Sequence, residues 1–213
     1  MEAMAAQTQY EDGYWWSKDG LRLHYRDYPG RADRPPILCI PGLTRNARDF
    51  AHVADRLAGD WRLICVDLRG RGESGYSKLP MSYGPLTYLQ DLEDLLDTLG
   101  IEHFVSFGTS LGGLMTMMLA AHRTGRIAGA LLNDIGPVIE DTGLERIRGF
   151  VGKSGSWPSW MHAARATANT LGAAHPDYDL SRWISLSKRL NRLTAQGRIV
   201  PDYDARIAEP MRH

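Results

Sequence analysis

Short apolar runs alternate with amphipathic segments along the first two thirds of this chain. The apolar runs are Pro35–Ile40, Trp61–Leu68, Phe104–Phe107 and Ile127–Leu132. Runs of this length, apolar almost throughout, predict buried strands. Such strands are typical of a mostly parallel sheet with helices on both faces.

Between these runs, apolar residues recur at the spacing of a helix. The clearest helical segment stops at Gly100 and contains Leu89, Leu92, Leu95, Leu96 and Leu99. Phe50, Val53 and Leu57 mark another helix, and Leu114–Ala121 a third. The alternation of strands and helices predicts an α/β fold.

The segment Tyr14–Tyr28 predicts an antiparallel hairpin ahead of these elements. An Asp19–Gly20 turn leads into a strand in which Leu21, Leu23 and Tyr25 alternate with polar residues. Such alternation is typical of a hairpin with one solvated face. His24 falls on the polar side, so we expect it to be solvated rather than a ligand.

The pattern changes after Pro137, where no further apolar run resembles the earlier strands. The helix-like pieces beyond this point are Gly143–Gly152, Trp157–Leu171 and Leu180–Leu193. We interpret them as a helical cap that follows the sheet. The predicted division of the chain is a core at 1–137, a cap at 138–208 and the start of a return to the core at 209–213.

Large apolar side chains in this second part allow two interpretations. Trp157, Trp160, Met161 and Trp183 either line a pocket or pack the cap onto the body, and packing is the commoner role of aromatic residues on short helices. Met115, Met117 and Met118 are predicted to lie mainly in the core.

The charge balance argues against a nucleic-acid or membrane partner. The 213 residues include 25 basic and 25 acidic side chains, so the net charge is zero and no strong positive field is expected. No apolar run approaches the ~18 residues of a membrane span, and the first residues do not resemble a signal peptide. We therefore expect a cytoplasmic protein with a small-molecule substrate.

Cys39 and Cys65 are the only cysteines, and both lie inside apolar strand runs. We expect them to be buried free thiols rather than a disulfide, a zinc site or a catalytic thiol, because no Cys/His cluster accompanies them. No metal site is predicted.

The candidate chemistry lies in His103–Leu114, where a predicted strand meets a predicted helix across Gly108-Thr109-Ser110-Leu111-Gly112. This is the G-x-S-x-G nucleophile elbow, in which a serine occupies a strained turn and the glycines leave room for the backbone to reverse. A larger side chain at Gly108 or Gly112 would crowd that turn. Ser110 is therefore the candidate nucleophile.

Glycine-marked loops also follow the earlier strands, at Gly42 and at Gly70–Gly75. Ligands of open α/β sheets bind at the carboxyl ends of the strands. We expect these loops to meet the Ser110 turn there. Asp67, Arg69 and Arg71 are predicted to hold the neighbouring loop in place rather than to take part in chemistry.

Taken together, IPGLTRN, DLRGRGES, GTSLGG and NDIGP, in this order and followed by a cap, resemble the α/β-hydrolase superfamily. The resemblance covers nearly the whole chain and is closest to capped bacterial hydrolases of ester, lactone or C–C bonds. It implies that the backbone N–H groups of Leu43 and Leu111 form the oxyanion hole. Pro41 replaces the usual histidine of the first motif, but a main-chain donor survives that change.

The remaining members of a catalytic triad are less clear from the sequence. Asp134 follows the strand after the Ser110 strand, where some relatives place the triad acid; alternatively it hydrogen-bonds the loop at Pro137. A general-base histidine should follow the last strand. His122 lies too far along the same helix, His162 and His175 belong to the predicted cap, and His213 is the last residue.

The sequence therefore predicts an α/β-hydrolase core with a cap, truncated at the C-terminus, in which the final strands and the general base are missing. We expect the exposed sheet edge to associate with another chain. The predicted function is cofactor-free cleavage of a small ester, lactone or related acyl substrate through an acyl-enzyme; the related epoxide hydrolases place Asp where this chain has Ser110. The alternative is a non-catalytic or incomplete hydrolase-fold binding protein.

Overall fold

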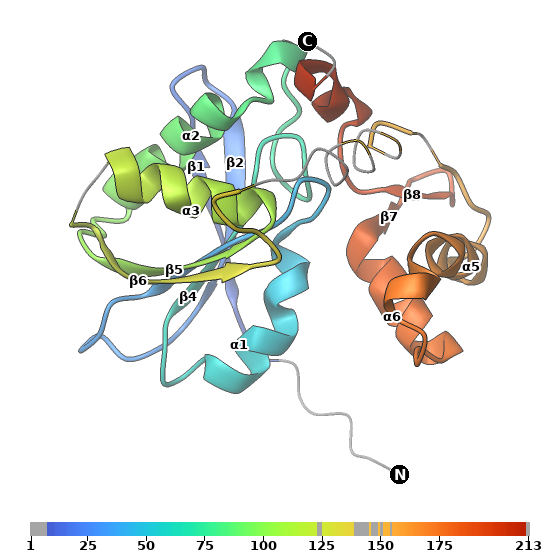
Figure 1. Cartoon of the computed structure of the whole chain (residues 1–213), viewed down its shortest axis with the longest axis horizontal. Coiled ribbons are helices and arrows are strands. Elements are labelled where there is room, and N and C mark those ends of the chain that lie inside the picture. The colour runs from blue at the N-terminus through green and yellow to red at the C-terminus, as the bar shows by residue number, and fades with distance from the viewer. Residues whose placement is uncertain are drawn as a thin grey trace.

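The computed structural model describes residues 8–122, 125–138, 145, 149, 151–153 and 155–211. A six-stranded sheet with helices on both faces forms the main body, and a smaller unit containing two helices lies beside it (Figure 1). The predicted α/β fold is therefore confirmed.

The large sheet has the strand order β1-β2-β4-β3-β5-β6. Its strands are β1 (Glu11–Trp16), β2 (Arg22–Tyr28), β3 (Ile37–Ile40), β4 (Leu63–Asp67), β5 (Phe104–Thr109) and β6 (Ile127–Asn133). The β1–β2 and β2–β4 pairs are antiparallel, and the remaining pairs are parallel. Each predicted apolar run forms a strand, and the carboxyl ends of β3, β4, β5 and β6 meet at one edge of the sheet. The prediction that all four runs are buried is wrong for β6, none of whose residues is buried, because in the described part of the chain it pairs with β5 on one side only.

Helices cover this sheet from opposite sides (Figure 1). One face carries α2 (Pro85–Thr98) and α3 (Leu111–His122), and the other carries η1 (Ala47–Phe50) with α1 (Ala51–Leu57). A short η2 (Pro80–Ser82) precedes α2. The leucine-rich helix ends as predicted, because Gly100 adopts a left-handed φ of 63°.

Two buried apolar clusters reflect these two layers. The cluster under α2 and α3 includes Leu23, Ile40, Val66, Leu92 and Met115. The cluster under α1 includes Tyr28, Phe50, Leu63, Cys39 and Cys65. Both cysteines are free and fully buried, which confirms their predicted role as small buried hydrophobes.

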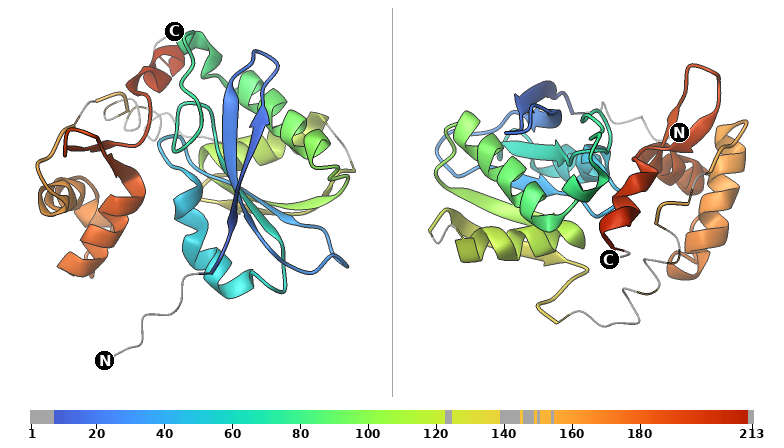
Figure 2. Two further views of the ribbon diagram at one scale, coloured as in Figure 1. Left: turned by 180° about the vertical axis from the view of Figure 1, so that it is seen from behind. Right: turned by 90° about the horizontal axis from the view of Figure 1, so that it is seen from above.

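In its described residues, the second unit contains two helices, two short strands and two 3-10 turns (Figure 2). Its elements are α5 (Trp160–Leu171), η3 (Gly172–Ala174), α6 (Leu180–Leu190), β7 (Asn191–Leu193), β8 (Ile199–Pro201) and η4 (Ala205–Met211). Trp183 packs with Ala164 and Leu186 between α5 and α6, so its aromatic side chain has the predicted packing role. The predicted helix at Gly143–Gly152 falls largely outside the described residues.

The cap differs from prediction at the end of α6. The helix stops at Leu190, and Asn191–Leu193 pairs instead as an antiparallel strand with β8. The expectation of a helical piece reaching Leu193 is therefore wrong. Strands of three residues are too short to give a periodic signal, and the turn between them depends on Gly197, whose φ is 73°.

The chain forms backbone hydrogen bonds with the core again from Asp202 onwards, before Ala208, where the predicted cap ends. The Gly72 N–H donates to the Asp202 carbonyl, and the Asp204 N–H donates to the Gly70 carbonyl. Ile207 and Ala208 are buried in the main apolar cluster. The last described turn therefore packs against the loop that follows β4.

Candidate active site

Ser110 lies at the junction between β5 and α3 with a φ of 51°. A left-handed conformation is uncommon for a serine and is strained. The Ser110 N–H donates to the Asn133 carbonyl at 2.9 Å, and the Ser110 carbonyl accepts from Gly113 at 2.8 Å. The surrounding backbone thus holds Ser110 in the conformation that a nucleophile elbow requires.

The glycines around Ser110 are needed for space, as predicted. A Cβ atom on Gly112 would lie 1.9 Å from the Ile40 carbonyl oxygen, and one on Gly108 would lie 2.2 Å from the Gly112 carbonyl oxygen. A Cβ atom on Gly113 would lie 2.3 Å from the Cγ2 atom of Ile135. The start of α3 can therefore approach β3 and β5 only without side chains at these positions.

The loop after β3 reaches the same place. A Cβ atom on Gly42 would lie 3.7 Å from the Ser110 Cβ, so Gly42 and Leu43 border the serine. Leu111 is the first residue of α3, and N–H groups in the first turn of a helix have no partner within that helix. Leu43 follows Gly42 in this loop and Leu111 follows Ser110 at the start of α3, and the oxyanion-hole role of both residues stays a prediction.

Asp134 follows β6 and has a left-handed φ of 58°. Its neighbour Asn133 lies opposite Thr109 in the parallel β5–β6 pair, so Asp134 is next to the Ser110 turn. The residue is exposed, and its carboxylate has no hydrogen-bond partner among the described residues. This position is compatible with a triad acid. The alternative, that Asp134 hydrogen-bonds the loop at Pro137, has no hydrogen bond among the described residues in its favour.

The described histidines are engaged away from Ser110. His122 contacts Glu93 at 2.8 Å, His162 contacts Ser159 at 2.8 Å, and His175 stacks on Tyr178 with ring centroids 4.5 Å apart. No described histidine forms a hydrogen bond with Ser110. His213 lies outside the described residues. Among the described residues, Ser110 therefore has no imidazole hydrogen-bonded to it.

His24 was predicted to be solvated, and this prediction is wrong. It is 1% exposed, and its Nδ1 and Nε2 atoms contact Asp67 and Asp12 at 2.7 and 2.8 Å. Burial by itself lowers the pKa of an imidazole, but the two carboxylates outweigh it, so the His24 pKa is raised above 6.5. The alternation in β2 could not reveal this, because the carboxylates come from neighbouring strands.

Asp67 connects this histidine to the candidate site. Its carboxylate also accepts from the N–H groups of Ala47, at 2.7 Å, and Glu73, at 3.0 Å. The first lies in the loop after β3 and the second in the loop after β4. Asp67 therefore ties the two loops together, which confirms the predicted structural role.

Arg69 has a structural role as well. It is 1% exposed and pairs with Asp91 at 2.7 Å and with Asp19 at 2.8 Å. The Arg69 hydrogen bonds lower the pKa of Asp19 to about 2. The arginine thus joins the β1–β2 turn to α2 beneath the loop after β4.

The cap contacts the loop after β3 directly. The Asn46 and Arg48 side chains donate to the Arg189 carbonyl at 2.9 and 3.1 Å, and Arg48 also pairs with the buried Asp202 carboxylate. The described part of the cap therefore lies against one of the loops that border Ser110.

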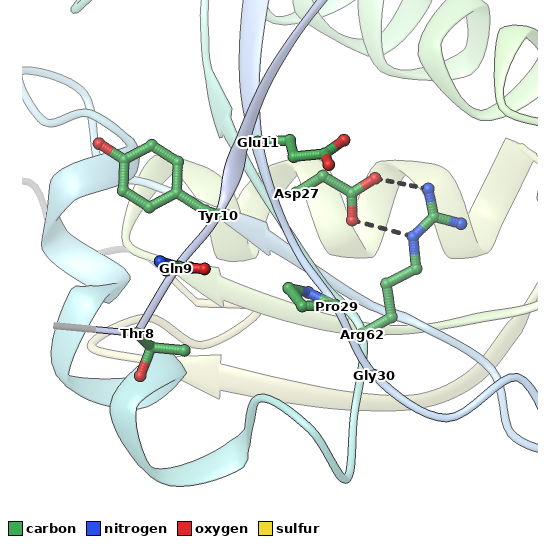
Figure 3. Close-up of a pocket in the computed structure, with 8 residues that line it drawn as sticks. All are labelled: Thr8, Gln9, Tyr10, Glu11, Asp27, Pro29, Gly30 and Arg62. Carbon is green, nitrogen blue, oxygen red and sulfur yellow. Dashed lines mark hydrogen bonds and ion pairs between the residues drawn. The ribbon is translucent and has the colours of Figure 1, made fainter. Parts of the chain in front are cut away.

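A separate open cavity of about 710 Å³ lies at the other end of the sheet (Figure 3). Arg62 and Asp27 face each other across two hydrogen bonds of 3.0 and 2.7 Å in its wall. Tyr28 pairs with Leu63 at the amino end of β4, whereas Ser110 follows the carboxyl end of β5. This cavity is therefore remote from the candidate site.

Two observations concern the described residues as a set. They contain no cluster of three or more His, Cys, Asp or Glu side chains arranged to hold a metal ion. None of their helices combines the length and apolar character that crossing a membrane would require.

The model for the alpha/beta hydrolase fold family matches residues 35–209. A crystal structure of an alpha/beta hydrolase from Novosphingobium aromaticivorans superposes with a TM-score of 0.94 at 57% identity, covering 97% of this chain and 73% of that one. This match extends over the core and the cap together.

Among characterised relatives, the 3-hydroxybutyrate-oligomer hydrolase of Cupriavidus necator is 31% identical over 195 residues, or 90% of this chain. Epoxide hydrolase 4 of Mus musculus is 31% identical over 101 residues, or 47% of this chain. The matched parts of this chain span 66% and 28% of the lengths of those two proteins.

Proposed function

This chain belongs to the α/β hydrolase fold family, and on that premise we propose that it cleaves a small carboxylic ester, lactone or related acyl substrate through an acyl-enzyme at Ser110. The observation that carries the proposal is the left-handed φ of 51° at Ser110, directly between β5 and α3. Strain of this kind is retained where function requires it. Epoxide hydrolases of this superfamily place Asp at the nucleophile position, and a serine there favours acyl chemistry.

In the proposed reaction, the Ser110 hydroxyl attacks the carbonyl carbon while a base takes its proton. The negative charge on the carbonyl oxygen is stabilised by the N–H groups of Leu43 and Leu111. The bond to the leaving alcohol breaks and the alcohol takes up the proton. Water then attacks the Ser110 ester and releases the acid, and Asp134 is the candidate acid that orients the base.

The relatives support an ester as the substrate class. The name of the Cupriavidus necator protein describes hydrolysis of 3-hydroxybutyrate oligomers, which are chains of short hydroxy acids joined by ester bonds. We propose that this chain accepts a comparably small acyl group.

A first test is hydrolysis of p-nitrophenyl butyrate by the 213-residue chain. The Ser110→Ala variant should lose at least about a thousandfold in kcat, because nothing else supplies the nucleophile. Ser185→Ala, on an exposed position of α6, should retain full activity. Turnover that survives Ser110→Ala would disprove the assignment.

The second candidate function is that of a hydrolase-fold binding protein that lacks its base. The specific observation in its favour is that none of the described histidines contacts Ser110. In that case, p-nitrophenyl butyrate turnover should be very slow, and free imidazole should raise it more for the wild-type chain than for Ser110→Ala, because the added imidazole replaces the missing base at Ser110.

A Ser110→Cys variant examines the elbow without requiring a base. Iodoacetamide should label this thiol in the folded protein, because the start of α3 stabilises a thiolate. The wild-type chain is the control, since Cys39 and Cys65 are both fully buried and burial raises the Cys65 pKa. Equal labelling of Ser110→Cys and the wild-type chain would show that iodoacetamide does not reach position 110, which would contradict the proposed elbow.

A further inference from the structure

Arg71 is the buried side chain that the proposed reaction leaves unexplained. It lies in the loop after β4 and is 0% exposed. Among the described residues no carboxylate pairs with it, in contrast to Arg69, which pairs with two. Removing a guanidinium from water without a counter-charge is costly, so its retention needs a reason.

The hydrogen bonds of Arg71 lead to the candidate site. Its Nε donates to the Leu43 carbonyl at 2.8 Å, and its Nη1 donates to the Arg69 carbonyl at 2.6 Å and to the Tyr88 hydroxyl at 2.9 Å. The guanidinium carbon also lies 4.9 Å from the centre of the Tyr88 ring. The planar group is therefore held by α2 and by its own loop, and its remaining contact holds Leu43.

One nitrogen of this guanidinium, with its two N–H donors, remains unused. The buried Nη2 atom has no hydrogen-bond partner among the described residues. Other described arginines also have a buried unpaired Nε atom, but Arg71 combines its unpaired nitrogen with the absence of a described carboxylate partner, and a buried unsatisfied group calls for an explanation.

We propose that Arg71 is a positioning residue for the oxyanion site, where it holds Leu43 so that the Leu43 N–H faces the reacting oxygen before the reaction begins. This inference rests on the proposed function. Asp67 anchors the same loop at Ala47, at 2.7 Å, so the loop is held on both sides of Asn46. Preorganised donors stabilise an oxyanion because they need no reorientation as charge develops.

The charge of Arg71 acts in the same direction. A buried positive group that no described carboxylate neutralises lowers the energy of negative charge that forms nearby. Lysine at this position would keep the charge but could not present the planar set of donors. Methionine would remove both the charge and the donors. The two substitutions therefore separate geometry from charge.

The experiment compares Arg71→Lys and Arg71→Met with Arg69→Lys in kcat, KM, melting temperature and the inhibition constant of a trifluoromethyl ketone. Arg69 is the matched control, because it is equally buried in the same loop but bonds to neither Leu43 nor Ala47. Arg71→Lys should lower kcat by roughly 10- to 100-fold, less than the full loss of one donor. The inhibitor should weaken by a similar factor, since the ketone forms an oxyanion on Ser110, and KM should change little.

Arg69→Lys should lower the melting temperature and leave kcat within about threefold. If Arg71→Lys alters kcat no more than Arg69→Lys does, or raises only KM, the proposal is overturned. If Arg71→Met does not fold, Tyr88→Phe replaces it. That variant removes one bond to the Arg71 Nη1 atom and should lower kcat by a smaller factor.

A readout without turnover separates this inference from the proposed function. Amide exchange of residues 42–47 should be faster in Arg71→Lys than in the wild-type chain and unchanged in Arg69→Lys. If the wild-type chain does not turn over esters, the proposed function fails while the exchange measurement still tests the positioning of this loop. Unchanged exchange in Arg71→Lys would overturn the positioning role.

Discussion

The conformation of Ser110 connects stability and proposed function at one residue. Its φ of 51° places a non-glycine residue in the left-handed region, at a typical cost of ~1 kcal/mol or more. The hydrogen bonds of the turn and the close packing of α3 against β3 offset this cost. It should be measurable by substitution.

We predict that Ser110→Gly is about 1 kcal/mol more stable than Ser110→Ala, because glycine accepts a positive φ and alanine does not. Urea unfolding of the two variants measures the difference. Ser185, exposed within α6, provides the control. There, glycine should be about 1 kcal/mol less stable than alanine. The same order at both positions would contradict the strain at Ser110.

His24 makes the stability of the protein depend on pH. Its pKa is raised above 6.5 because Asp67 and Asp12 outweigh the effect of burial. Protonation therefore favours the folded state: the contribution is fully present below about pH 6.5 and is lost as pH rises through the higher pKa of the folded protein.

We expect the free energy of unfolding of the wild-type chain to fall relative to that of His24→Asn as pH is raised above about 6.5. Urea unfolding of both proteins at several pH values measures this difference, and taking the difference removes the titration of groups that the two proteins share. Both proteins keep Tyr14, whose ring centre lies 5.2 Å from that of His24 in the wild-type chain. A pH-independent difference would show that His24 is not charged in the fold.

At the scale of elements, the site depends on how closely α3 packs against β3 and β5. Gly112 lies against the Ile40 carbonyl, and Ser106 of β5 bonds Thr116 of α3 at 2.7 Å beneath the turn. The helix and the strands therefore have little freedom to separate.

The Gly112→Ala variant should be destabilised by about 2 to 3 kcal/mol, because its Cβ atom would meet the Ile40 carbonyl oxygen at 1.9 Å. Thermal unfolding measures this loss. Gly172→Ala is the matched control, since a Cβ atom there would meet nothing within 4 Å and should change stability by no more than about 0.5 kcal/mol. Equal effects of the two substitutions would contradict the predicted crowding.

At the scale of the whole molecule, β6 is the outer strand of the six-stranded sheet on the side of Ser110. Leu131 and Leu132 point to opposite faces of this strand and are 49% and 39% exposed. Exposed apolar strands with an open edge favour pairing with another chain.

We predict that the 213-residue chain self-associates through β6 as its concentration rises, and sedimentation velocity is the measurement. Leu132→Lys should shift the equilibrium towards monomer, because a charged side chain at a strand edge opposes pairing. Leu86→Lys, which changes an exposed leucine on α2, is the control. A chain that stays monomeric at all concentrations would rule out this association.

The sequence by itself determined the features that depend on local geometry. Apolar runs predicted the strands, although β6 is largely exposed rather than buried, and the spacing of Gly108, Ser110 and Gly112 predicted a turn that only glycine can flank. The steric reason for that turn lies within a few residues, so it can be read along the chain.

Only the tertiary structure decided which distant groups meet. His24 is buried because Asp67 lies opposite it across the β2–β4 pair, and Arg71 reaches Leu43 although 28 positions separate them. The short β7 and β8 strands likewise depend on each other. Contacts between separate elements depend on strand order and packing, and the hydrophobic pattern of a single segment does not contain that information.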